Sequence, residues 1–102
     1  MTDRRRISIL ILDDEARVRS ELSEFLMNTG FMVHAEGMPS DALEYLARHP
    51  VDIVILDIKL PEMDGLEVLR RIRRDHPITE VIMISGHGDM NTVIEAMRFG
   101  AV

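Results

Sequence analysis

Two kinds of hydrophobic spacing alternate along the chain. Nearly continuous apolar runs are typical of strands that are covered on both faces. We predict strands at 7–12 (ISILIL), 31–35 (FMVHA), 52–56 (DIVIL) and 80–85 (EVIMIS). The segments between them place apolar side chains three and four residues apart, as on the buried face of a helix. We predict helices at 15–29, from 39 to about 49, from 64 to about 76, and from 89 towards 100.

Residues at the ends of these segments support the same division. Gly30 is suited to the position just after a helix, where a left-handed conformation is common, and Pro39 suits a first helical turn. Asp64 and Glu67 have the spacing of a capping box. Asp89 can cap the last predicted helix. Four strand–helix units therefore follow one another without a linker or repeat.

The alternation predicts an α/β fold, in which a parallel sheet has helices on both faces and right-handed crossovers. In such sheets ligands bind beyond the carboxyl ends of the strands. Asp13 and Asp14 follow the first strand, Asp57 ends the third and Ser85 ends the fourth. All these side chains should meet at one edge of the sheet. Clustered carboxylates repel one another unless a cation lies between them, and Mg²⁺ prefers oxygen ligands of this kind.

Each acidic residue has a simpler interpretation when it is considered alone. A single aspartate after a strand, such as Asp57, is ordinarily a turn or cap residue. Glu15 is best explained as the start of the first helix, where its charge favours the helix dipole. The arginines of 70–74 are most simply the solvated side of one helix. Three aspartates and a serine at the ends of three strands are harder to explain as caps, so we favour a site.

Composition narrows the class of protein. A chain of 102 residues with 46% hydrophobic and 29% charged residues suits one globular domain, 1–102. It has no cysteine, which excludes disulfides and thiolate sites and fits a cytoplasmic location. A net charge of −6 argues against direct nucleic-acid binding by this domain. No apolar stretch is long enough for a membrane span, and the first residues lack the apolar core of a signal peptide.

Three motifs in combination resemble a known family. The segments ILDDE, VILDIKLPEMDG and VIMISGHGD are similar to the receiver domain of bacterial two-component response regulators, and the similarity runs from about Ile7 to the C-terminal end. The stretch ISGHGDMNTVIEAMRFGA resembles receivers of the nitrogen-regulation, enhancer-binding class. The resemblance implies a flavodoxin-like sheet with strand order 2-1-3-4-5.

The resemblance also implies a role for each site residue. Asp57 would accept a phosphoryl group from a sensor histidine kinase. Asp14, Asp57 and the backbone carbonyl of Lys59 would bind Mg²⁺ or Mn²⁺ directly, and Asp13 would act through a water molecule. The Ser85 hydroxyl would contact the phosphoryl group and switch the partner surface. The consequence would be control of a covalently linked output domain, in transcription regulation, without the chain being an enzyme in its own right.

The sequence departs from the family pattern at its C-terminal end. It stops at FGAV, where the family continues with a fifth strand, a switch aromatic, a lysine and a fifth helix. Lys59 is the only lysine, so no other lysine can replace the missing one. We therefore expect a truncated receiver whose 80–85 strand is an open edge. Such an edge favours self-association, so we predict a homo-oligomer.

Two alternatives use the same aspartate differently. A Mg²⁺-dependent aspartyl-phosphate hydrolase would place a second aspartate two residues after its nucleophile, but Lys59 occupies that position, and 102 residues leave little room for a cap domain. A self-associating fragment with an inactive site is the other alternative. Phosphorylation by a small donor distinguishes the receiver from the inactive fragment.

Overall fold

The structure, a computed structural model, describes residues 6–84. It contains seven elements in the order βαβαβαβ: β1 (Ser8–Leu12), α1 (Ala16–Asn28), β2 (Met32–Glu36), α2 (Pro39–Arg48), β3 (Ile53–Asp57), α3 (Gly65–Asp75) and β4 (Glu80–Ile84). The predicted strands and helices of this part are confirmed, with ends that differ by one or two residues. Ser85 and the helix predicted from Asp89 lie outside the described residues.

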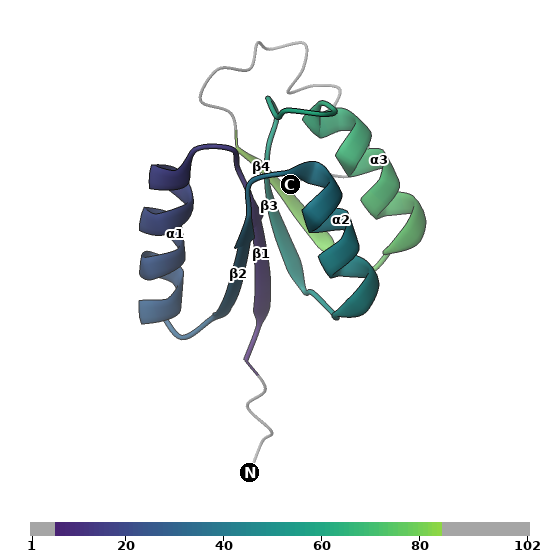
Figure 1. The fold of residues 1–102 in the computed structure, drawn as a ribbon. Helices are drawn as coiled ribbons and strands as arrows, with labels where there is room; N and C mark the ends of the chain where they lie inside the picture. The colour runs from purple at the N-terminus through teal and green to yellow at the C-terminus, as the bar shows by residue number, and fades with distance from the viewer. Residues whose placement is uncertain (1–5, 85–102) are drawn as a thin grey trace.

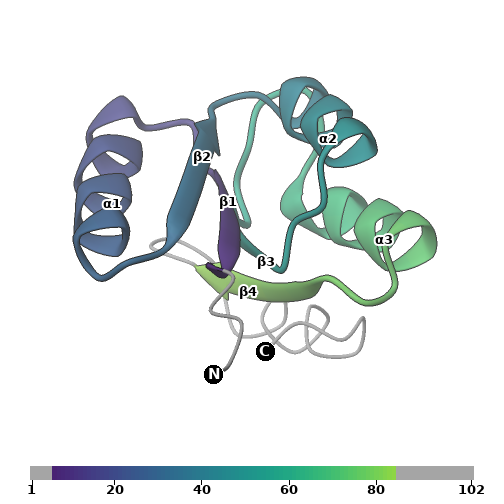
Figure 2. The ribbon, with the colours of Figure 1, turned by 90° about the horizontal axis from the view of Figure 1, so that it is seen from below.

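The four strands form one parallel sheet in the order β2-β1-β3-β4, which confirms the predicted fold class. Ile9 of β1 is paired with Val33 on one side and with Ile53 on the other, and Ile53 is paired with Glu80 of β4. Helix α1 covers one face of the sheet, and α2 and α3 cover the opposite face (Figures 1 and 2). This two-sided cover explains why the central strands are apolar at almost every position.

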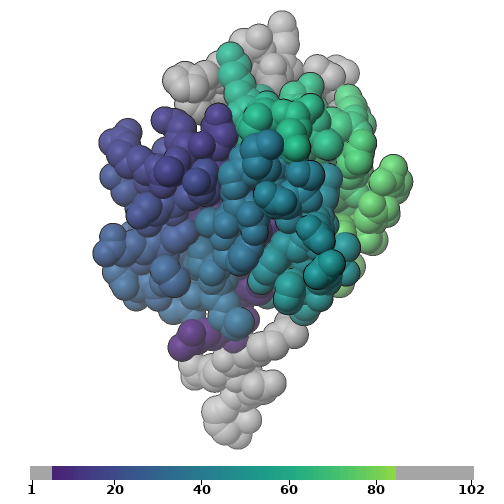
Figure 3. Space-filling model, in the orientation of Figure 1, coloured from purple at the N-terminus to yellow at the C-terminus, as the bar shows by residue number. Residues whose placement is uncertain are grey.

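Each face of the sheet has its own apolar cluster. On the side of α2 and α3, Leu10 and Val54 of the central strands pack with Leu69 and Ile72 of α3, and all four side chains are fully buried. On the side of α1, the buried residues are Ile9, Ile11 and Ile55, with Leu22 and Leu26 packed against them. No residue of α1 itself is fully buried. Because the clusters bury β1 on both of its faces, little of this strand is visible in the space-filling view (Figure 3).

The predicted helix ends are confirmed, with one correction. Gly30 has φ 110°, the left-handed conformation expected after α1. Asp64 is the N-cap of α3, and its Oδ1 accepts a hydrogen bond from the backbone N–H of Glu67 at 3.0 Å. The reciprocal half of the predicted capping box is wrong. The Glu67 carboxylate instead accepts hydrogen bonds from Arg70 and Arg71, three and four residues later, at 2.6 and 3.1 Å.

Three rings join the edge strand β2 to α2. Tyr45 is stacked between His34, with ring centroids 3.9 Å apart, and His49, with centroids 4.2 Å apart. The Nε2 atom of His34 lies 2.6 Å from a carboxylate oxygen of Glu36. The stack fixes α2 against an edge strand that has no buried apolar position of its own.

Within residues 6–84, no helix has the length and apolar character needed to cross a membrane.

Candidate functional site

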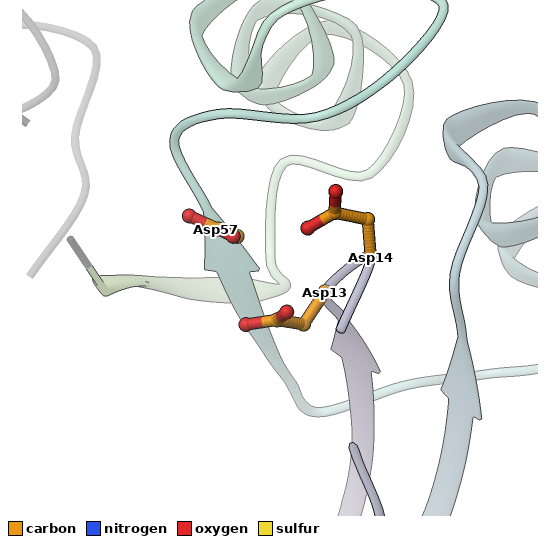
Figure 4. Close-up of side chains that lie close together, drawn as sticks. All are labelled: Asp13, Asp14 and Asp57. Carbon is orange, nitrogen blue, oxygen red and sulfur yellow. The ribbon is translucent and has the colours of Figure 1, made fainter. Parts of the chain in front are cut away.

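Three aspartates meet at the carboxyl edge of the sheet. Asp57 is the last residue of β3, and Asp13 and Asp14 follow β1 directly. The two strands are parallel neighbours, with Leu12 paired with Leu56, so they end at the same level. One carboxylate oxygen from each aspartate lies within 4.8 Å of the corresponding oxygen of the other two (Figure 4). The predicted convergence of these side chains is therefore confirmed.

Asp13 is the most restrained of the three. It is 3% exposed, and its backbone N–H donates to the Glu36 carbonyl at 3.2 Å. Its Oδ1 accepts a hydrogen bond from the backbone N–H of Glu15 at 2.9 Å, and its carbonyl accepts one from Nη1 of Arg19 at 2.8 Å. Asp14, the next residue, is exposed. One aspartate is thus fixed by the protein, and its neighbour is open to solvent.

The surroundings of Asp57 disfavour the charged form of its carboxyl group. Burial is the largest effect, and it raises the pKa of this carboxyl group above its ordinary value. The negative charges of Asp13 and Asp14 raise this pKa further, while backbone hydrogen bonds from Lys59 and Ile58 lower it. The contact from the Lys59 N–H to Oδ1 is 3.3 Å long. A cation among the three carboxylates would offset their repulsion and favour the charged form of Asp57.

The residues present fit a hard divalent cation. Three carboxylates within reach of one another, on one buried, one half-buried and one exposed residue, offer the oxygen ligands that Mg²⁺ prefers and leave space for water. An open depression lies beside them, lined by Asp14 and by residues of the loop that follows Asp57. The depression is large enough to admit a group bound at the aspartates.

The loop after Asp57 is packed closely against the end of β3. The Gly65 N–H donates to the Ile58 carbonyl at 2.7 Å. A Cβ atom at Gly65 would lie only 2.6 Å from the Asp57 carbonyl oxygen and 2.7 Å from Cα of Ile58. The absence of a side chain at Gly65 therefore allows α3 to begin directly beside the phosphoacceptor candidate.

The same loop is also attached to α2. Glu62 has φ 65°, an uncommon conformation for a residue other than glycine. Its carboxylate accepts hydrogen bonds from the backbone N–H and the hydroxyl of Ser40, at 3.0 and 3.2 Å, in the first turn of α2. A negative charge is favourable at a helix N-terminus. The loop that carries Lys59 is therefore restrained at Glu62 as well as at Gly65.

The structure thus brings together Asp13, Asp14 and Asp57, and it places Lys59 in the adjoining loop. Ser85, the fourth predicted member of the site, lies outside the described residues. The sequence analysis missed the contacts of Arg19 and Glu62. Both side chains bind backbone groups of another segment, so no spacing along the chain reveals them.

Comparison with known proteins agrees with this architecture. The family described as "Response regulator receiver domain" matches residues 9–102, so the chain belongs to that family. The resemblance noted from the sequence is confirmed.

Two named relatives show which regulators this chain is similar to. A "Putative response regulator NtrX-like" from Rickettsia bellii is 42% identical over 97 residues, which are 93% of this chain and 20% of the relative. The "Regulatory protein LuxO" of Vibrio vulnificus is 33% identical over 91 residues, 89% of this chain and 20% of that protein. This chain therefore spans about a fifth of the length of these relatives.

Solved structures show the same fold. A CheY-like receiver domain from Methanospirillum hungatei has a TM-score of 0.91 and 25% identity, over 95% of this chain and 78% of that one. NtrX from Brucella abortus has a TM-score of 0.88 and 34% identity, over 95% of this chain and 22% of that one.

Proposed function

We propose that this receiver domain accepts a phosphoryl group on Asp57 from a phosphohistidine of a sensor histidine kinase. The observation that carries the proposal is the cluster of three aspartates at the ends of β1 and β3, with burial and repulsion concentrated on Asp57. Asp14 and Asp57, with the backbone carbonyl of Lys59, would hold Mg²⁺, and Asp13 would act through water. The ion, when bound, supplies positive charge to phosphoryl oxygens and to the carboxylates around it.

The chemistry that falls to the chain's own residues is nucleophilic attack and positioning. A carboxylate oxygen of Asp57 forms a bond to phosphorus as the phosphorus–nitrogen bond of phosphohistidine breaks. The leaving imidazole nitrogen keeps the electron pair and takes a proton from solvent, so the products are an acyl phosphate and a neutral imidazole. Phosphoryl transfer depends mainly on position and charge neutralisation. The short, tightly packed turn at Gly65 fixes the end of β3, and the Lys59 N–H orients one oxygen of Asp57.

Phosphorylation would then change the surface that partners recognise. Ser85 follows β4 in the sequence, and its hydroxyl is our candidate for contact with the phosphoryl group. The NtrX-like and LuxO relatives are about five times longer than the matched region, which supports a covalently linked output domain. Their names support a regulatory role, which we propose to be transcription regulation in the cytoplasm. Self-association through the β4 edge stays a prediction, to be tested by light scattering across a concentration series.

Labelling with a small phosphodonor tests the proposal. The chain is incubated with acetyl phosphate and Mg²⁺, and intact mass is measured. We expect a gain of one phosphoryl group that requires Mg²⁺ and is absent from Asp57→Asn. Asp41→Asn, which changes an exposed aspartate of α2, is the matched control and should be labelled like the unmodified chain. A folded chain that binds Mg²⁺ but takes no label would favour the inactive fragment, and repeated turnover of a small phosphate ester would favour the hydrolase.

A further inference from the structure

The guanidinium group of Arg19 lies beside the aspartate cluster without belonging to it. Arg19 is on the first turn of α1, is partly buried, and donates from Nη1 to the backbone carbonyl of Asp13 at 2.8 Å. Hydrogen bonds from a charged donor are roughly twice as strong as neutral ones. The contact therefore ties the helix that follows the acidic loop to the beginning of that loop.

Gly37 provides the space that this side chain occupies. A Cβ atom at Gly37 would lie 2.7 Å from Nη1 and 3.2 Å from Cζ of Arg19. Real Cβ atoms do not approach a heavy atom so closely, so any larger residue would displace the guanidinium. Gly37 follows β2 directly, and the preceding residue, Glu36, accepts the backbone hydrogen bond of Asp13. The end of β2 and Arg19 thus hold Asp13 from two sides.

We propose that Arg19 is a positioning residue for the Mg²⁺ site, and that Gly37 is the glycine that admits it. The inference rests on the proposed function, because it concerns the same cation. Asp13 and Asp14 are adjacent, so a rotation of the Asp13–Asp14 peptide moves both carboxylates relative to Asp57. The Arg19 contact is made to the oxygen of that peptide. Fixing it keeps three mutually repelling carboxylates in the arrangement that a cation needs.

The expected size of the effect follows from other metal sites. Residues that orient a ligand without touching the metal typically contribute 10–100-fold in affinity. Asp13 retains two further hydrogen bonds when Arg19 is removed, one from Glu15 and one to Glu36. The lower end of that range, about tenfold, is therefore expected for Arg19→Met.

Mg²⁺ titration followed by amide chemical shifts tests the proposal on folded protein. Arg19→Met should raise the Kd for Mg²⁺ about tenfold, and Gly37→Ala should raise it in the same direction. Arg17→Met is the matched control, because it removes the same charge from an exposed position on the same helix turn. Its Kd should stay within about twofold of the unmodified chain, as expected for charges screened by solvent.

The outcomes separate the inference from the function on which it rests. Amide shifts that do not respond to Mg²⁺ in the unmodified chain would overturn both. Binding by the unmodified chain with an unchanged Kd in Arg19→Met and Gly37→Ala would overturn only the positioning role. A loss of stability in urea without Mg²⁺, with an unchanged Kd, would show that Arg19 merely joins α1 to the residue that follows β1, and would overturn the positioning role. If Arg19→Met fails to fold, the Kd of Gly37→Ala decides.

Discussion

Replacing Gly65 by alanine is the most direct test of the packing around the proposed phosphoacceptor. The added methyl group would lie 2.6 Å from the Asp57 carbonyl oxygen, 2.7 Å from Cα of Ile58 and 2.8 Å from the Ile58 carbonyl oxygen. Favourable carbon contacts begin near 3.5 Å, so each of the three is strongly repulsive. All three atoms belong to the backbone, which cannot move aside by changing a rotamer.

The cost can be estimated from the parts of the structure that must move. Inserting one carbon into a packed core typically costs about 1–3 kcal/mol. The upper part of that range applies because Asp57 is paired with β4, so its backbone cannot move away from the added methyl group without disturbing the sheet. Alanine recovers at most about 1 kcal/mol through its higher helix propensity. The free energy of unfolding should therefore fall by roughly 2 kcal/mol, which corresponds to a fall in Tm of about 10 °C for a domain of this size.

Urea unfolding followed by circular dichroism measures this difference. Glu24→Ala, which shortens an exposed side chain of α1, is the control. It should cost less than about 0.5 kcal/mol, as for most surface substitutions. If the free energy of unfolding of Gly65→Ala lies within the same 0.5 kcal/mol of that of the unmodified chain, the reasoning is refuted. The start of α3 could then move away from the end of β3 without a loss of stability.

Three further substitutions test individual contacts. The pKa of Asp57 in the folded chain is raised above 3.8, its ordinary value in the unfolded chain. Between these two pKa values the folded chain binds more protons than the unfolded chain, so the free energy of unfolding falls as pH rises through this window. Asp57→Asn should therefore resist urea better than the unmodified chain at pH 7 in EDTA, and the difference should vanish towards pH 3.8; equal stability at pH 7 would contradict it. Asp64→Ala removes the cap on the Glu67 N–H and should cost about 1 kcal/mol in urea, whereas Asp64→Ser should keep most of it. Thr79→Val removes a buried hydroxyl that donates to the Val51 carbonyl at 3.0 Å, and should cost about 1–2 kcal/mol, with Thr79→Ser as the variant that retains the bond.

The parts of the fold that are buried on both faces were the most predictable. Strands β1 and β3 carry apolar residues almost without interruption because helices cover the sheet on either side, and the runs are too short for a buried helix. The ends of the strands were less predictable, because the predicted ranges of both β2 (31–35) and β3 (52–56) are displaced by one residue from Met32–Glu36 and Ile53–Asp57. The half of the capping box that failed involves Glu67, whose carboxylate had two arginines within one turn as alternative partners.

The site was predictable only as far as topology determines it. Parallel strands end at one edge, so Asp13, Asp14 and Asp57 could be placed together from their positions after apolar runs. The contacts of Arg19 with the Asp13 carbonyl and of Glu62 with Ser40 could not. Each contact depends on the direction that a long side chain takes across a turn, and no regular spacing of residues in the sequence predicts that direction.

The ring stack between β2 and α2 gives this protein a built-in optical probe. Tyr45 is the only tyrosine, and the chain has no tryptophan. Ultraviolet emission excited near the tyrosine band therefore reports one place, where the phenol ring lies between His34 and His49. Circular dichroism averages over every helix and strand. Agreement of the two signals during unfolding would establish that α2 separates from the sheet only when the whole domain unfolds, and a difference would reveal an intermediate.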